Sequence, residues 1–146
     1  MTKADPPGRH SYAWFAPITT RWSDNDIYGH VNNVVYYSYF DSIANRYLIE
    51  EGGLNIHDGG IVGLVVNSGC DYHAPVAYPQ ALEGGLRVDR LGNSSVTYGI
   101  AIFMQGAEIA CANGTFTHVF VDRETQRPVS IPEAMRTALA AIEAGG

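Results

Sequence analysis

The longest pattern of apolar positions in the chain lies between residues 32 and 53. Its apolar residues recur every three to four positions, as on one face of an α-helix, and most polar residues fall on the other face. The apolar set is Tyr36, Tyr37, Phe40, Ile43, Ala44, Tyr47 and Leu48. The asparagine pair 32–33 is favoured at a helix start, and the glycine pair 52–53 suits the left-handed turn that ends a helix. We therefore predict one long helix of about 27 Å, at 1.5 Å per residue.

The other apolar segments have the character of β-strands. Residues 14–23 alternate loosely, and residues 61–72 begin with the run Ile-Val-Gly-Leu-Val-Val, which favours a strand covered on both faces. Three further alternating strands are predicted at 82–89, 95–104 and 108–122. Consecutive strands joined by short turns pair antiparallel. The predicted order is β-α-β-β-β-β, an α+β fold whose antiparallel sheet curls around the central helix.

The length and the two ends of the chain predict a single domain over residues 1–146. Residues 1–12 are polar and contain prolines, so we expect a flexible tail. Residues 130–133 have the capping-box pattern and early proline of a helix start, which predicts a C-terminal helix at 130–144. One central helix cannot cover both faces of the sheet. The apolar run at 61–66 indicates that a partner covers the remaining surface.

Composition and charge exclude several classes of protein. The formal net charge of −6 argues against a nucleic-acid surface. No apolar run approaches membrane-spanning length, and the N-terminal residues lack a signal-peptide core, so we expect a cytoplasmic protein that does not enter a membrane. Cys70 and Cys111 lie in apolar strands, where buried thiols are expected rather than a disulfide. No Cys/His cluster suggests a metal site, and no cofactor is expected.

The segment RWSDNDIYGHVNNVVYYSYFD, residues 21–41, resembles the signature of the hotdog-fold acyl-CoA thioesterases, specifically the 4-hydroxybenzoyl-CoA thioesterase-like family. The matching elements are the Asp-x-Asp pair, the Gly-His-Val-Asn-Asn string and the aromatic start of the helix. Three later segments, GCDYHAPVAYP, RLGNSSVTY and FTHVFVD, extend the resemblance over residues 18–132. The resemblance implies the hotdog fold, a homodimer or homotetramer, and active sites between subunits.

The resemblance also implies the catalytic residues. Asp26, the second acid of the pair, matches the catalytic carboxylate, and the main-chain N–H near Asn33 matches the group that polarises the thioester carbonyl. A carboxylate can activate water or attack the carbonyl directly, and this choice stays open. Unpaired N–H groups at a helix N-terminus suit an oxyanion. His30 is a third catalytic candidate, because similar plant acyl-carrier-protein thioesterases are thought to use this histidine; alternatively, it shapes the turn.

The substrate-binding candidates lie on the same loop, on the helix and on the later strands. They are Gly29, Asn32, Tyr36, Tyr72, His73 and Arg90. For Asn32 the pattern favours a cap or turn residue over substrate contact, and the aromatic side chains could equally be core. The loop before Ser95 lacks the basic cluster with which close relatives bind the phosphates of the coenzyme. Phosphate contacts are therefore expected from Arg90, Arg123 or Arg127, unless the carrier is not coenzyme A.

The predicted activity is hydrolysis of an acyl-CoA or acyl-carrier thioester to a free acid and a thiol. An enoyl-thioester hydratase or dehydratase is the alternative enzyme class. Its dehydratase pattern is absent, and the spacing from Asp26 to His30 is one residue short of the hydratase pattern. A non-catalytic acyl-thioester-binding protein is the third class, and it would need an added domain. The acyl group stays open between short aliphatic, long aliphatic and aromatic chains.

Overall fold

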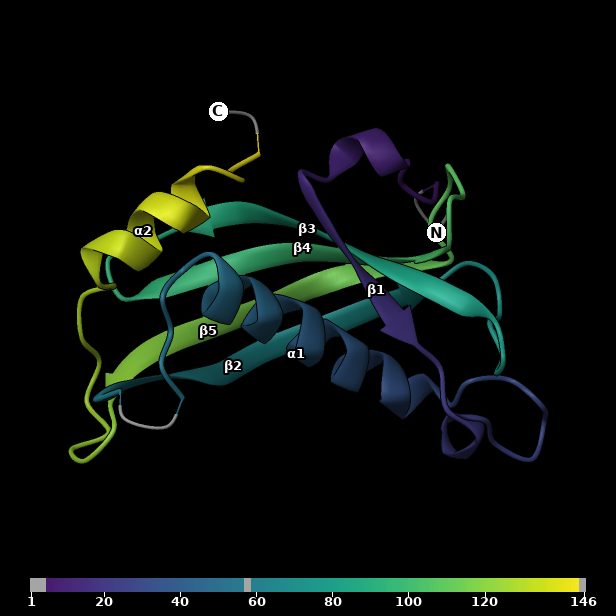
Figure 1. Cartoon of the computed structure of the whole chain (residues 1–146), viewed down its shortest axis with the longest axis horizontal. Coiled ribbons are helices and arrows are strands. Elements are labelled where there is room, and N and C mark those ends of the chain that lie inside the picture. Colours follow the sequence, from purple (N-terminus) through teal and green to yellow (C-terminus); the bar gives the residue numbers. More distant parts are fainter. Residues whose placement is uncertain (1–4, 57–58, 145–146) are drawn as a thin grey trace.

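The structure, a computed structural model, describes residues 5–56 and 59–144. A five-stranded antiparallel sheet in the order β1-β3-β4-β5-β2 curves around α1 (Figure 1). The elements are η1 (Arg9–Ser11), β1 (Trp14–Thr19), η2 (Trp22–Asp24), α1 (Asn33–Glu50), β2 (Ile61–Tyr72), β3 (Ala81–Leu91), β4 (Ser95–Met104), β5 (Ala112–Asp122) and α2 (Glu133–Ala140), where η denotes a short 3-10 helix. The predicted α+β fold, with a sheet wrapped around one long helix, is confirmed.

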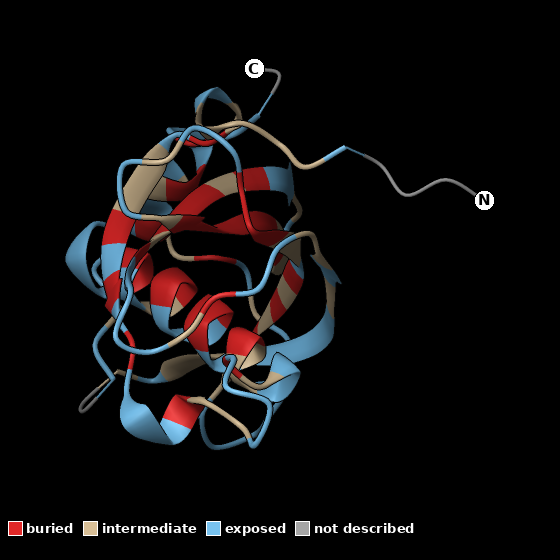
Figure 2. Cartoon of the chain, turned by 90° about the vertical axis from the view of Figure 1, so that its right-hand side faces the viewer, coloured by how far each residue is buried: buried red, intermediate tan, exposed pale blue. Residues whose placement is uncertain are grey.

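The helix α1 packs its apolar face against the concave side of the sheet (Figure 2). Its buried residues are Tyr36, Tyr39, Phe40, Ile43, Ala44, Tyr47 and Leu48. Both predicted ends are confirmed, because Asn32 caps the helix and Gly53 follows it with a φ of 72°. Helix and sheet approach closely at Gly84, where an added Cβ would lie 2.4 Å from Ile43 Cγ1. A glycine in β3 thus lets the sheet close over α1.

The strand β2 lies at the edge of the sheet. One side of it pairs with β5, and no strand of the described residues pairs with the other side. Leu64, Val65 and Val66 are 41%, 46% and 58% exposed, and the register with β5 shifts between Val65 and Asn67. The prediction that both faces of this strand are covered is therefore not met within one chain. The exposed apolar edge has the properties of a surface that pairs with another chain.

The N-terminal segment differs from the predicted flexible tail. Residues 1–4 lie outside the described residues, but the chain from Gly8 onward is packed on the sheet. Arg9 forms an ion pair with Glu83, and Tyr12 is 7% exposed with its ring 5.9 Å from the ring of Phe103. Alternate residues of β4 face α1, so Phe103 points to the opposite face of the sheet. The segment therefore covers part of the outer face, which gives it a small apolar cluster of its own.

Two strands are shorter than predicted, because the chain forms turns where strand was expected. β1 ends at Thr19 instead of residue 23, since the chain turns through η2. β5 begins at Ala112 instead of residue 108. The two cysteines, Cys70 and Cys111, are not joined by a disulfide.

The C-terminal helix α2 is shorter than the predicted 130–144 and starts differently. Pro132 occupies the N-cap position without a side-chain hydrogen bond, so the capping-box prediction is wrong. The side chain of Ser130 instead donates a hydrogen bond to Asn93 Oδ1 over 3.4 Å. The Tyr47 hydroxyl donates to the Ala138 carbonyl over 2.5 Å and ties α1 to α2. Among the described residues, neither helix is long and apolar enough to cross a membrane.

Candidate active site

The loop between η2 and α1 is a tight turn closed by main-chain hydrogen bonds. Asn25 pairs with Val31 in an antiparallel bridge, and the Asp26 N–H donates to the His30 carbonyl over 2.9 Å. Gly29 donates its N–H to the Asp26 carbonyl and has a φ of 83°, a conformation that glycine adopts at little cost. Antiparallel pairing of this kind holds paired Cα atoms about 5 Å apart. Asp26 therefore lies beside the residues that lead into α1.

The carboxylate of Asp26 is half-exposed at this turn. Its Oδ1 accepts a hydrogen bond from the Tyr28 N–H over 2.9 Å, and within the described part of the chain Oδ2 accepts none. The residue lines a hollow of about 820 Å³ together with Trp22, Ser23, Asn25, Ile27, Tyr28, Gly29 and Asn32. A carboxylate oxygen that accepts no hydrogen bond from the protein and faces an open hollow can accept a proton from water or attack an electrophile.

The start of α1 supplies unpaired main-chain donors. Asn32 Oδ1 accepts from the Val34 N–H over 3.0 Å, and the Asn32 carbonyl accepts from the Val35 N–H over 2.9 Å. No acceptor for the Asn33 N–H occurs among residues 5–56 and 59–144. Such a donor at a helix N-terminus favours negative charge on an adjacent oxygen. The Asn33 N–H can therefore serve as an oxyanion donor.

A second pocket of about 300 Å³ also reaches the start of α1, and it is largely apolar. Its walls are His30, Val31, Asn33, Tyr36, Tyr72, His73, Ala74 and Pro75. The Tyr72 hydroxyl donates to the Asn33 carbonyl over 3.0 Å, and the rings of Tyr36 and Tyr72 meet edge to face at 4.9 Å. Burial raises the pKa of Tyr36 to about 12 and also raises the pKa of Tyr72, so both phenols stay neutral near pH 7.

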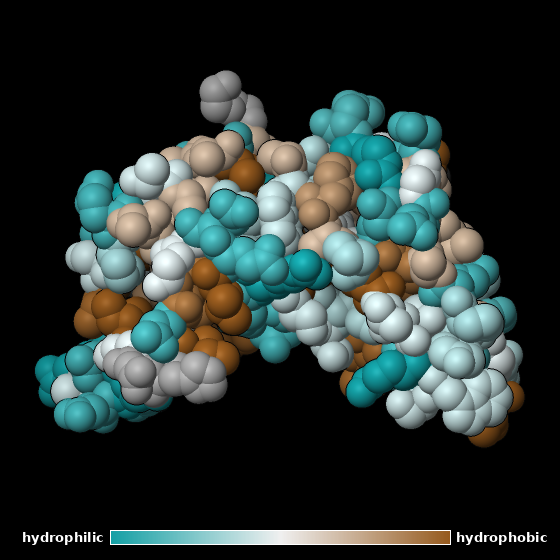
Figure 3. Space-filling view, viewed as in Figure 1, coloured by the Kyte–Doolittle hydropathy of each residue, from teal (hydrophilic) through white to brown (hydrophobic). Residues whose placement is uncertain are grey.

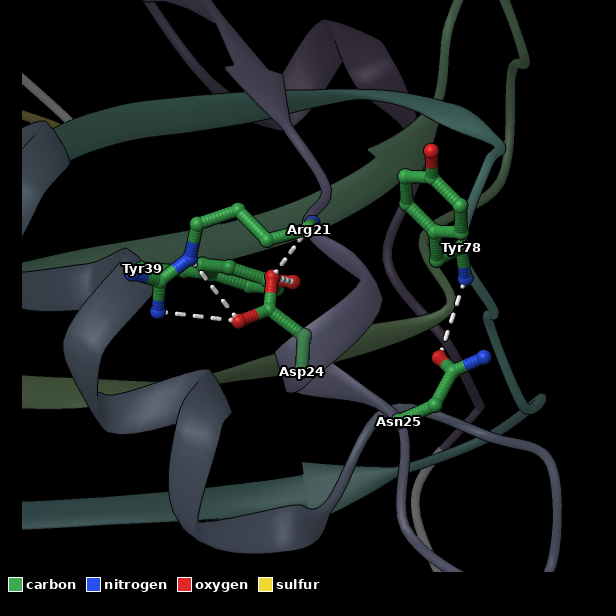
Figure 4. A network of polar contacts seen from close by, with 5 residues as sticks. All are labelled: Arg21, Asp24, Asn25, Tyr39 and Tyr78. Carbon is green, nitrogen blue, oxygen red and sulfur yellow. Dashed lines mark hydrogen bonds and ion pairs between the residues drawn. The ribbon is translucent and has the colours of Figure 1, made fainter.

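The base of the loop is fixed by Asp24, whose carboxylate is buried at 1% exposure. The carboxylate accepts hydrogen bonds from the Tyr39 hydroxyl at 2.7 Å and from the Arg21 N–H at 2.9 Å (Figure 4). The Arg21 guanidinium donates to the same carboxylate through Nε at 3.1 Å and Nη2 at 3.0 Å. Burial by itself would raise the pKa of Asp24, but the hydrogen bonds from Tyr39 and Arg21 outweigh it and hold that pKa below its ordinary value.

Comparison with known proteins identifies the family. The sequence model of the Thioesterase-like superfamily matches residues 20–139, most of the chain and all of the site. The chain belongs to this superfamily. Its fold is the hotdog fold, as the resemblance implied.

The chain is also similar to individual proteins and solved structures. The PA5185 protein of Pseudomonas aeruginosa strain PAO1 is 60% identical, with a TM-score of 0.95 over 97% of this chain and 99% of that chain. The protein YsmA of Bacillus subtilis strain 168 is 26% identical over 121 residues, 82% of this chain and 80% of that protein. A 1,4-dihydroxy-2-naphthoyl-CoA thioesterase from Synechocystis is 16% identical, with a TM-score of 0.77 over 86% of this chain and 94% of that chain. At this identity, the last likeness shows the fold alone.

In this thioesterase-like chain, the predicted site residues fall into three groups. One group, around the larger hollow, is Asp26, Gly29 and Asn32. A second group, around the smaller pocket, is His30, Asn33, Tyr36, Tyr72 and His73. Arg90 belongs to neither, because it lies nine residues after the start of β3 at Ala81, about 30 Å along the strand at 3.3 Å per residue. The start of β3, and not its end, lies beside the loop.

The other arginines expected to contact phosphate also lie away from the start of α1. Arg123 and Arg127 follow the end of β5, which pairs with the start of β2, whereas the pocket is built at the end of β2. The Arg123 guanidinium donates to the Ile56 carbonyl over 3.0 Å. Among the described residues of one chain, none of these arginines contacts Asp26 or Asn33, so a contact with the substrate's phosphates would have to come from a second subunit.

Asp24 is the residue that sequence reasoning missed. The Asp-x-Asp pattern drew attention to its partner Asp26, and Asp24 received no role. Two features of the sequence bear on it: Arg21 at a spacing of three residues, and Tyr39 on the helix. The described residues contain no group of three or more His, Cys, Asp or Glu side chains that could hold a metal ion.

Proposed function

We propose that this chain hydrolyses an acyl-CoA or acyl-carrier thioester to a free acid and a thiol. The Asp26 carboxylate acts as the base or nucleophile, and the Asn33 N–H binds the oxyanion. One observation carries this proposal: the half-exposed Asp26 carboxylate lies on a turn that leads into α1, and among the described residues one of its oxygens has no donor and the Asn33 N–H has no acceptor. Superfamily membership supports the reaction class.

The reaction needs few groups, because a thioester carbonyl is already electrophilic and a thiolate leaves without strong protonation. In the general-base route, Asp26 takes a proton from water, and the resulting hydroxide attacks the carbonyl carbon. The Asn33 N–H stabilises the negative oxygen of the tetrahedral intermediate. The intermediate then expels the thiolate, which takes the proton back from Asp26. In the nucleophilic route, Asp26 itself attacks the carbonyl carbon, the C–S bond breaks and the thiolate leaves, which gives a mixed anhydride. Water then hydrolyses the anhydride to the free acid and the Asp26 carboxylate, and the second proton of the water goes to the thiolate.

The remaining residues around the two hollows support binding roles. The apolar pocket beside Asn33, walled by Tyr36 and Tyr72, fits an acyl group whose carbonyl lies at the helix start. The main-chain carbonyl of His30 closes the turn by accepting the Asp26 N–H, and His30 also lines the apolar pocket beside Asn33, so turn-shaping and catalytic roles both remain open for it. Gly29 lines the Asp26 hollow, and its φ of 83° favours glycine there, whereas space does not require it, since beyond its chain neighbours no atom lies within 4 Å of an added Cβ.

A thiol-release assay with a panel of acyl thioesters tests the function. The panel contains short aliphatic, long aliphatic and aromatic acyl-CoAs, with the same acyl groups on an acyl carrier protein. Aromatic acyl-CoAs are tested first, because Tyr36 and Tyr72 line the pocket and their rings can make edge-to-face contacts with an aromatic acyl group. We expect thiol release from at least one class. Tight binding without thiol release from any of them would instead indicate a binding protein.

We further propose that the protein is a homodimer or homotetramer. The loop before α1 projects at the lower right of the molecule, where apolar surface is exposed (Figure 1, Figure 3). Ile27 and Tyr28 on this loop are 93% and 81% exposed, and the apolar edge of β2 lies open. Surface of this kind favours association with a second copy.

Light scattering at micromolar concentration should therefore give a mass of two or four chains. Val66→Asp should weaken the assembly, because it places an unpaired charge on the edge of β2. Ile109→Asp is the matched control, since Ile109 is 55% exposed but lies before β5, away from this edge. A monomeric wild-type protein would contradict both the assembly and a site shared between subunits.

Coenzyme A recognition can be tested by charge. If the carrier is coenzyme A, the KM should rise with salt, because salt screens the contacts between phosphate and arginine. Arg90→Ala, Arg123→Ala and Arg127→Ala should raise KM more than they lower kcat. Arg46→Ala is the control, since its guanidinium already pairs with Glu50 at 2.7 Å. An unchanged KM in all three variants would show that the phosphates bind elsewhere or that the carrier is different.

A further inference from the structure

We infer that Asp24 is a positioning residue, whose buried carboxylate fixes the Asp26 loop to the side of α1. The inference rests on the proposed function, because it concerns where Asp26 stands relative to the Asn33 N–H. Asp24 does not touch substrate in this scheme. Its carboxylate is 1% exposed, and each of its oxygens already accepts two hydrogen bonds.

Asp24 forms hydrogen bonds with two residues of the helix, the cap and a residue two turns later. Its main-chain carbonyl accepts the N–H of Asn32, the helix cap, over 2.9 Å. Its carboxylate accepts the hydroxyl of Tyr39, seven positions further along the helix, over 2.7 Å. Seven residues of helix correspond to about 10 Å along the axis, so the Tyr39 side chain reaches back toward the helix start to meet Asp24. One main-chain and one side-chain hydrogen bond therefore tie Asp24 both to the cap and to the body of α1.

Asp26 has no such anchor of its own. Its contacts among the described residues stay within the loop, to Tyr28, Gly29 and His30. The part of the loop after Asp26, which leads into α1, is held by the Val31 N–H, which donates to the Val76 carbonyl over 2.8 Å. The part before Asp26 is held by the two preceding residues, Asp24 and Asn25.

Figure 4 shows that the side chains of Asp24 and Asn25 make contacts on opposite sides of the loop. Asp24 points toward α1, between Arg21 and Tyr39, while Asn25 points away from it. Asn25 Oδ1 accepts the main-chain N–H of Tyr78, in the connection between β2 and β3, over 3.0 Å. The Asp26 main chain is thus positioned from the helix side by Asp24 and from the sheet side by Asn25.

Arg21 makes the helix-side anchor possible. A buried carboxylate without a partner would be costly, and the guanidinium of Arg21 supplies the compensating charge. The side chain of Arg21 is 69% exposed, so it closes the network from the solvent side. Asp24 therefore stays ionised and keeps both of its oxygens available as acceptors for Tyr39 and Arg21.

Tyr39→Phe tests the positioning role by removing one hydroxyl while keeping the ring. We expect kcat to fall about 10-fold with little change in KM, because small misplacements of a catalytic group lower the rate. Tyr47→Phe is the matched control: its hydroxyl is also buried and hydrogen-bonded, but it ties α1 to α2 at the other end of the helix. Both variants should lose similar thermal stability, and only Tyr39→Phe should lose kcat.

Repeating Tyr39→Phe in an Asp26→Asn background decides whether the effect runs through Asp26. If Tyr39 and Asp24 only position Asp26, the second substitution should lower kcat no further, which is the non-additivity expected of coupled residues. Asp24→Asn should behave in the same way. A 10-fold loss that recurs in the Asp26→Asn background overturns the positioning role and leaves the proposed function intact. A fully active Asp26→Asn enzyme overturns both.

Discussion

Asp26→Asn should fold and assemble like the wild-type protein and hydrolyse thioesters at least ~100-fold more slowly. Asparagine has nearly the same shape as aspartate, and its amide oxygen can still accept the Tyr28 N–H that holds the turn. The amide can neither attack a carbonyl nor take a proton from water. The kcat of thiol release should therefore fall while KM stays close to the wild-type value, because binding by the apolar pocket is untouched.

Two substitutions separate this effect from a general disturbance of the loop. Asp41→Asn removes an exposed carboxylate of α1 that, in the part of the chain that the structure describes, accepts only from the Asn45 side chain, and it should keep kcat. His30→Ala should cost about 10-fold through a shifted turn, since small misplacements lower the rate. A larger loss at His30 than at Asp26 would assign the base role to the histidine. Unchanged hydrolysis in both variants would exclude this mechanism altogether.

The parts of the fold that the sequence predicted are those with local causes. The cap at Asn32, the apolar stripe of α1 and the left-handed Gly53 each depend on spacings of a few residues along the chain. The packed N-terminal segment has no local cause. Tyr12 is buried because distant residues of the outer face, Phe103 and Ala101 on β4 among them, pack against it.

The sequence predicted which residues belong to the candidate site, but not how they are arranged in space. Its loop residues are contiguous, so one motif locates them together. Their division between two hollows depends on β2, which brings Tyr72 against the start of α1 through its register with β5. Arg90 is distant because β3 runs away from the loop. The burial of Asp24 depends on Tyr39, fifteen residues later, and no local pattern reports that contact.

Lowering the pH from 7.5 to 5 should cost the folded state about 2 kcal/mol through His118 alone. His118 is 1% exposed on β5, with its ring 5.3 Å from that of Phe116 and 6.1 Å from that of Phe120. Its Nδ1 lies 3.2 Å from the Tyr98 hydroxyl. Burial lowers the pKa of His118 to about 4, because the apolar surroundings disfavour the charged ring.

The direction of the effect follows from proton binding. The unfolded chain protonates this histidine near its ordinary pKa of about 6.5, while the folded chain does so only near pH 4. Between these values the unfolded state binds more protons, so stability is fully present above pH 6.5 and is lost as the pH falls toward 4. The carboxylates of Asp24 and Glu83, whose pKa values are lowered in the folded state, lose their contribution only at lower pH.

Urea unfolding at both pH values, at one fixed protein concentration, measures this loss. His118→Gln keeps an acceptor for the Tyr98 hydroxyl and cannot titrate, so its free energy of unfolding should change by about 2 kcal/mol less than that of the wild type. His10→Gln removes an exposed histidine of η1 and should leave the wild-type loss unchanged. If His118→Gln loses as much stability as the wild type, the proton is taken up elsewhere. The expected contrast between the two variants exists because β5 places the His118 ring among aromatic side chains of the core, where no carboxylate of the described residues pairs with it.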